Sequence, residues 1–158
     1  MGRPRLIKRY TSIPLDVAPE IDHPVYGKSR RQDLPCLWVR VGRPHGAKSP
    51  RFAAVVDSGS PYCIFRAEFA ELLGINLKSC YEDSLGGVIA GSRGPIYFHK
   101  ILLYVEMDWI ITVVAGFCES LAVNGILGGH GFFDHFQIRF DQAVDPPEFE
   151  ITKIERPN

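Results

Sequence analysis

The sequence predicts an all-β protein. Several segments alternate apolar and polar residues with a period of two, and turns rich in glycine and proline separate them. Only one or two short stretches space their apolar residues as a helix does. Roughly seven or eight short strands and one or two short helices are therefore expected. The chain has 158 residues, 46% of them apolar, which suffices for one domain with a sizeable core.

The first 33 residues differ from the rest of the chain. They contain four prolines and no sustained periodicity, so residues 1–33 are interpreted as a partly irregular N-terminal arm, with one short strand expected at residues 5–13. Residues 1–50 hold ten Lys or Arg against four Asp or Glu, whereas the remainder holds eight against fourteen. The compact domain is expected to span residues 34–158.

A hairpin opens this domain. Residues 34–41 ("LPCLWVRV") alternate as a strand does, and residues 51–56 ("RFAAVV") form a more fully buried strand. The intervening turn formers join the two, so that Asp57 follows the end of the second strand. Residues 66–74 then predict a short helix, with Gly74 as its stop signal.

The second half of the domain is predicted to carry most of the sheet. Four glycines between residues 86 and 94 indicate a hairpin-like segment. The aromatic residues Phe132, Phe133 and Phe136 suit one or two helical turns and are expected to be core. Strands are expected at residues 96–105, 109–117, 136–141 and 149–155.

Asp57 is the candidate catalytic residue, because an Asp is rarely placed at the end of a buried strand without a physical reason. The strand positions its carboxylate, Ser58 offers a hydroxyl, and Gly59 permits close backbone approach. Acid-catalysed peptide hydrolysis needs two carboxylates that share one proton. The sequence has no second Asp-Ser-Gly or Asp-Thr-Gly. A two-fold axis beside Asp57 would supply the missing carboxylate, which predicts a homodimer.

Three segments in this order, "VVDSGS", "LGGVIAGSRG" and "GILG", resemble the retroviral-type (retropepsin-like) aspartic proteases over roughly residues 34–154. The resemblance implies a closed, β-barrel-like acid protease fold with a flap hairpin. It also implies a homodimeric aspartic endopeptidase that uses an Asp57/Asp57′ dyad and a bound water, with no cofactor and no metal. Ser58 would help to lock the two loops together, and Gly59 would allow their close approach.

The resemblance assigns further residues. Ile126, Leu127 and Gly128 would pack against the active-site loop and support it. Residues 85–95 would form the flap that closes over an extended peptide substrate. The flap residues expected to bind substrate are Leu85, Gly86, Gly87, Val88, Ile89, Ala90 and Gly91.

Two features depart from the family pattern. His130 stands where the family usually has Asp or Asn at the start of the closing helix. The arm of residues 1–33 exceeds that of the minimal viral enzymes, and it could mask the cleft as a pro-segment, lengthen the dimer interface or be loose. A second function class stays open: a catalytically silent dimer of protease fold that binds extended peptides or acts as an assembly module.

Other functions find little support in the sequence. The pair His130 and Asp134 could share a helical face, but no third metal ligand is evident, and a capping or surface role is favoured. The four cysteines form no C-x-x-C pair and are interpreted as reduced, semi-buried thiols. The basic residues form no patch interleaved with aromatic residues, so the sequence does not indicate nucleic-acid binding. No signal peptide or membrane span is seen, so an intracellular, cytoplasmic location is expected.

Overall fold

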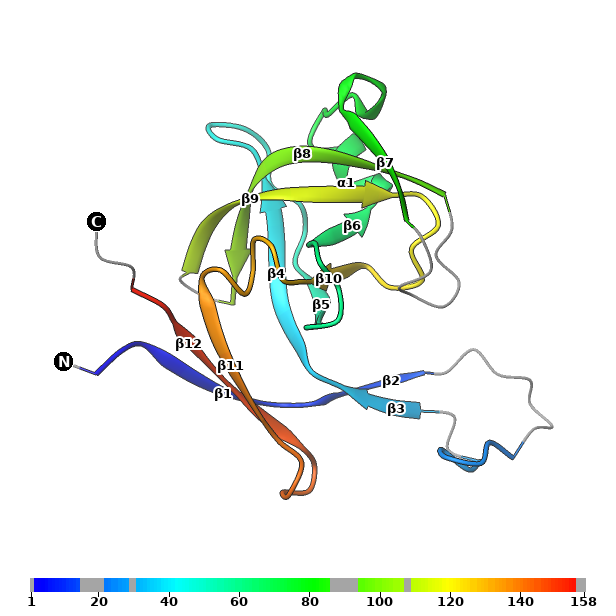
Figure 1. The fold of residues 1–158 in the computed structure, drawn as a ribbon, viewed down its shortest axis with the longest axis vertical. Helices are drawn as coiled ribbons and strands as arrows, with labels where there is room; N and C mark the ends of the chain where they lie inside the picture. The colour runs from blue at the N-terminus through cyan, green and yellow to red at the C-terminus, as the bar shows by residue number, and fades with distance from the viewer. Residues whose placement is uncertain (1, 15–21, 29–30, 86–93, 107–108, 156–158) are drawn as a thin grey trace.

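The computed structural model describes residues 2–14, 22–28, 31–85, 94–106 and 109–155 (Figure 1). This part of the chain is mostly β, as the sequence predicts. The strands are β1 (Arg5–Arg9), β2 (Thr11–Pro14), β3 (Arg31–Leu34), β4 (Cys36–Gly42), β5 (Phe52–Val56), β6 (Ile64–Arg66), β7 (Tyr81–Leu85), β8 (Gly94–Val105), β9 (Trp109–Cys118), β10 (Gly125–Leu127), β11 (Phe136–Asp141) and β12 (Glu148–Lys153).

Six strands form a closed barrel. They follow the order β4-β5-β10-β6-β9-β8, and β8 pairs back with β4 to close the ring. β4 and β5 form the antiparallel hairpin that the sequence predicts, and β7 extends the sheet as an antiparallel partner of β8. The closure leaves the barrel without an open edge except where β7 is added.

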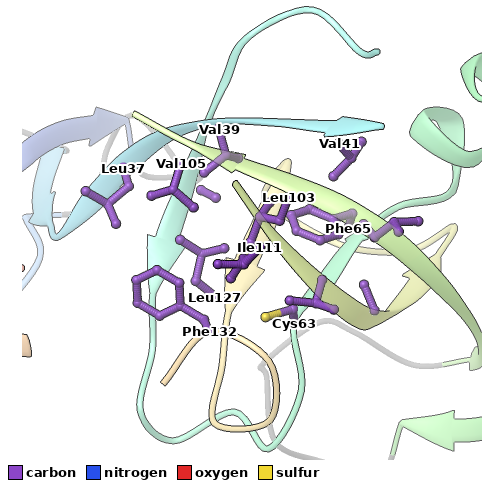
Figure 2. Close-up of a cluster of buried hydrophobic side chains, with 14 of the residues drawn as sticks. Leu37, Val39, Val41, Cys63, Phe65, Leu103, Val105, Ile111, Leu127 and Phe132 are labelled. Atoms are coloured by element: carbon purple, nitrogen blue, oxygen red, sulfur yellow. The ribbon is translucent and has the colours of Figure 1, made fainter. Parts of the chain in front are cut away.

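Alternating side chains fill the interior of the barrel. In β9, Ile111, Val113 and Ala115 point inward and are buried, whereas Ile110 and Val114 are exposed. This is the period of two that the sequence shows. Figure 2 shows the centre of the core, where residues from β4, β6, β8, β9 and β10 meet. The labelled side chains are Leu37, Val39, Val41, Cys63, Phe65, Leu103, Val105, Ile111, Leu127 and Phe132.

The helical structure is short. The α-helix α1 (Ala67–Leu72) packs beside β6 and β9 and buries Ala67 and Ala70. It ends where the amide of Gly74 donates to the carbonyl of Glu71, and Gly74 takes a φ of 67° that suits glycine. A single 3-10 turn, η1 (Leu77–Ser79), follows.

The N-terminal arm takes part in two smaller sheets. β1 is the outer strand of an antiparallel sheet of order β1-β12-β11, and β2 pairs only with β3. The sequence predicted one strand in residues 5–13, but Tyr10 interrupts the pairing and two strands form. β3 was not predicted, because "RQDL" has no run of β-branched or aromatic residues. Together with β6, β7 and β10, which are also absent from the predicted strands, these short strands raise the strand count above the predicted seven or eight.

The one or two helical turns expected around Phe132, Phe133 and Phe136 do not form a helix. The residues form hydrogen-bonded turns, and Phe136 already belongs to β11, where it pairs with Lys153. Gly131 takes a φ of 104°, which is incompatible with a right-handed helix. Phe132 and Phe136 are fully buried and Phe133 packs against the core, so the expectation that these aromatic residues belong to the core is confirmed.

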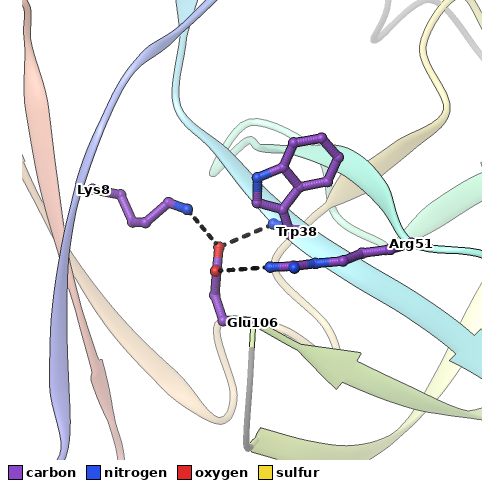
Figure 3. A network of polar contacts seen from close by, with 4 residues as sticks. All are labelled: Lys8, Trp38, Arg51 and Glu106. Carbon is purple, nitrogen blue, oxygen red and sulfur yellow. Dashed lines mark hydrogen bonds and ion pairs between the residues drawn. The ribbon is translucent and has the colours of Figure 1, made fainter.

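An ionic network joins the β1 sheet to the barrel (Figure 3). Glu106 follows β8 with a φ of 53°, and its side chain is only 9% exposed. One carboxylate oxygen accepts from the Trp38 amide at 3.0 Å and lies 3.1 Å from Lys8 of β1. The other oxygen lies 3.7 Å from Arg51. Glu106 therefore links β1, β4 and the segment that precedes β5.

Candidate active site

The loop that carries Asp57 is held by an unusual strand order. β5 and β6 flank this loop in the sequence, yet β10 lies between them in the sheet. β10 pairs parallel with β5 through Ile126 and Leu127, and antiparallel with β6 through Gly125 and Ile126. The loop of residues 57–63 must therefore pass around the end of β10, which fixes where it begins and where it returns.

Hydrogen bonds place Asp57 at the end of β5. Its amide donates to the carbonyl of Leu127 at 3.0 Å, which extends the parallel pairing by one residue. Its Oδ1 accepts from the Gly59 amide at 2.9 Å, and its carbonyl accepts from the Ser60 amide at 3.2 Å. These bonds form an Asx turn that keeps the half-buried carboxylate oriented. Ser58 and Gly59 are exposed beside it.

Gly128 allows the segment that follows β10 to approach the loop that carries Asp57. A Cβ atom on Gly128 would overlap the carbonyl oxygen of Tyr62 and would lie 2.6 Å from that of Ser60. The amide of Gly129 donates to the Ser60 carbonyl, and that of His130 donates to the Pro61 carbonyl, each at 2.8 Å. Residues 128–130 thus run directly against the second half of the Asp57 loop.

Ser60 is a structural residue of the site that the sequence did not reveal. It is 1% exposed, and its hydroxyl donates to the Tyr62 carbonyl at 2.8 Å. Its amide donates to the Asp57 carbonyl, and its carbonyl accepts from the Gly129 amide. Ser60 therefore connects the loop to the segment that follows β10. A serine in a glycine-rich turn usually faces solvent, and for this reason no sequence signal marked it as buried.

A buried thiol lies behind the loop. Burial raises the pKa of Cys63 to about 11, and the backbone amides of Gly128 and Phe132 offset part of this effect. Cys63 is fully buried, so its thiol stays protonated at neutral pH and serves as a core residue. All four cysteines are described, and none forms a disulfide, as the sequence predicts.

The flap residues assigned from the resemblance lie mostly outside the described part of the chain. These are Gly86, Gly87, Val88, Ile89, Ala90 and Gly91. Leu85 ends β7 and pairs with Gly94 of β8, so the two strands that flank this segment are antiparallel neighbours.

An open pocket of about 670 Å³ lies between these strands and the Asp57 loop. Its wall on the loop side is Tyr62, whose ring packs edge to face against Phe98 of β8 at 4.9 Å between centroids. Tyr81, His99 and Cys80 line the opposite side, and Cys80 Sγ lies 3.6 Å from His99 Nδ1. The pocket is thus aromatic-walled and borders the loop that presents Asp57.

The segment at His130 is occupied by local hydrogen bonds. Asp134 Oδ2 accepts from the Gly131 amide at 3.0 Å, and His135 Nδ1 lies 2.6 Å from the Gly131 carbonyl. His130 forms a parallel bridge with Tyr62. Among the described residues no group of three His, Cys, Asp or Glu side chains could hold a metal ion. Asp134 therefore stabilises the turn at Gly131, and no helix begins there for it to cap.

Comparisons with known proteins find no matching family model, no matching curated protein and no matching solved structure. In the part of the chain that the structure describes, no helix is long and apolar enough to cross a membrane.

Proposed function

We propose that this chain is an aspartic endopeptidase of the retropepsin-like class, which acts as a homodimer. The observation that carries the proposal is the insertion of β10 between β5 and β6. This insertion holds Asp57 at the end of a barrel strand, half-exposed and oriented by the Gly59 amide. A carboxylate that is rigidly placed and open to solvent suits general acid-base chemistry.

Each protomer contributes one such carboxylate. Among the described residues Asp57 has no ion-pair partner that would occupy its oxygens. Two copies related by a two-fold axis beside Asp57 would form a dyad that carries one proton. The ionised carboxylate takes a proton from the water that attacks the peptide carbonyl, and the protonated one donates its proton to the carbonyl oxygen. The carboxyl group that took the proton from water then gives it to the amide nitrogen of the diol, while the other carboxylate takes a proton from a diol hydroxyl. The C–N bond breaks, which releases the amine and the new carboxylic acid and restores the singly protonated dyad.

The substrate would be a peptide in extended form, bound through its backbone next to β7 and β8. The pocket lined by Tyr62 and Phe98 would accept a side chain of that peptide. The intracellular location expected from the sequence stays a prediction.

The test is cleavage of a diverse peptide mixture, read by mass spectrometry at several pH values between about 4 and 7.5, by the wild type and by Asp57→Asn. Asn keeps the oxygen that accepts from the Gly59 amide, so the loop is expected to fold normally. Cuts made by the wild type and absent from the variant support the proposal. The absence of cuts from a folded wild-type dimer would favour the silent peptide-binding alternative.

A mixing experiment tests the shared dyad. Excess Asp57→Asn protein is added to the wild type and allowed to exchange subunits. A dyad built from two copies predicts that activity falls toward zero as wild-type subunits are drawn into mixed dimers. Activity that is unaffected by the added variant would contradict a site shared between two copies.

A further inference from the structure

A second pocket, of about 340 Å³, lies on the outer surface of the barrel. It opens beside Arg51, which precedes β5, whereas Asp57 follows the other end of that strand. The pocket is therefore separate from the candidate active site. Its lining residues are Val39, Arg40, Lys48, Arg51, Tyr104 and Glu106.

The side chains around this pocket carry an excess of positive charge. Three of them are cationic, namely Arg40, Lys48 and Arg51, and Glu106 is the single anion among the lining residues. Glu106 is already compensated, because it lies 3.1 Å from Lys8 and 3.7 Å from Arg51. Among the described residues, Arg40 and Lys48 form no ion pair.

Two of the cations are held in place before any ligand binds. Arg51 contacts Glu106 and lies 5.5 Å from the centre of the Trp38 ring, as the orientation in Figure 3 shows. Lys48 Nζ lies 4.4 Å from the centre of the Tyr104 ring. Contacts of this kind restrict the two side chains in the free protein. Binding a ligand then costs less side-chain entropy.

The third cation is placed by the register of the barrel. Arg40 of β4 pairs directly with Tyr104 of β8, and both side chains lie on the outer face. Arg40 and Lys48 therefore line the same pocket, beside Tyr104, from different segments. Two positive charges that lie close together repel each other. An anion bound between them would attract both and offset that repulsion.

We propose that this pocket binds the phosphate group of a small ligand. A phosphate group carries close to two negative charges and three strong acceptor oxygens, which match three cations that reach the pocket from separate segments. Arginine binds such oxygens through two parallel N–H donors, and the pocket has the size of a small-molecule site. The proposal is independent of peptide hydrolysis, because no lining residue belongs to the Asp57 loop.

The test is thermal unfolding of the full chain titrated with inorganic pyrophosphate, with sodium chloride used to hold the ionic strength constant. Binding to the folded state raises Tm in a saturable manner. The double variant Arg40→Gln/Lys48→Gln should weaken this binding about tenfold or more. The matched control is Lys78→Gln/Arg139→Gln, which removes two exposed cations elsewhere and should respond like the wild type.

The outcomes separate the possibilities. A saturable rise in Tm that is lost only in the Arg40/Lys48 variant supports the site. An equal response of both double variants, or a wild-type response that does not saturate, overturns it. Saturable binding of citrate without binding of pyrophosphate would overturn the assignment to phosphate. Asp57→Asn should bind pyrophosphate as the wild type does. The test of the phosphate site is therefore independent of the proposed proteolysis.

Discussion

Gly128 packs directly against the carbonyl oxygen of Tyr62, and no side chain fits between them. This contact joins the end of β10 to the loop that carries Asp57. The contacted atoms belong to the backbone, so they cannot be moved aside by a change of rotamer. The position of the loop therefore depends on the absence of a Cβ atom at this one residue.

Gly128→Ala is expected to lower the free energy of unfolding by about 2 to 4 kcal/mol, because the new methyl group forces the backbone apart. Urea denaturation measures the change. Gly129→Ala is the matched control, since the nearest atoms to its Cβ would lie at an ordinary 3.6 Å. Equal stability of the two variants would contradict the close approach at Gly128.

Glu106→Gln should lower the free energy of unfolding by about 1.5 to 3 kcal/mol, because charge-assisted bonds to three segments are lost at a nearly buried site. Glu148→Gln is the control. Glu148 pairs with Arg9 at 3.8 Å, and Arg9 is 73% exposed, so a change near zero is expected. A loss confined to Glu148→Gln would refute the linking role of Glu106.

The cysteines should differ in reactivity. Cys80 is partly exposed in the aromatic pocket and lies beside His99, whereas Cys36, Cys63 and Cys118 are buried. Ellman's reagent should therefore modify one thiol rapidly in the native protein, and Cys80→Ser should remove this phase. Rapid modification that persists in Cys80→Ser would show that a buried thiol is accessible.

Two buried thiols also predict a loss of stability at alkaline pH. Burial raises the pKa of both Cys36 and Cys63 from 9.0 to about 11. The unfolded chain therefore releases its thiol protons first, and the free energy of unfolding falls as pH rises from about 9 to about 11. The loss is at most about 2 to 3 kcal/mol for the fully buried thiol of Cys63. Cys63→Ala should reduce this slope in urea denaturation between these pH values, and an unchanged slope would contradict the assignment.

Phe132→Ala should cost about 3 to 5 kcal/mol, because the ring is fully buried and packs against Phe133 and Phe136. Phe140→Ala serves as the comparison. Phe140 is 41% exposed, so its truncation should cost clearly less. Similar losses for the two variants in chemical denaturation would place Phe132 outside the core.

The sequence allowed the main strands of the barrel to be predicted because their burial is periodic. Residues 34–41 and 51–56 alternate or run apolar, and the structure pairs them as β4 and β5. The short strand β3 escaped prediction and β2 was predicted only as the end of one longer strand, since mostly exposed polar residues form their pairing. The turns at residues 131–135 were mistaken for helix because the spacing of the phenylalanines fits either structure.

The candidate site was predictable only in part. Asp57 and the segment at Ile126–Gly128 could be found from their order in the chain, and the structure brings them side by side. The role of Ser60 could not be found, because its burial and its bond with the Gly129 amide depend on tertiary contacts. The basic pocket was also missed, since Arg40, Lys48 and Arg51 converge only when β4, β5 and β8 close the barrel.

The position of β10 between β5 and β6 has a consequence for how the chain reaches its native state. β5 and β6 cannot form a local hairpin, because each pairs with a strand that begins only at Gly125. On the ribosome, these two strands have no shared partner until residues 125–127 have been synthesised. Contacts so distant in sequence slow folding, so completion of the Asp57 loop is expected to be a late step of folding.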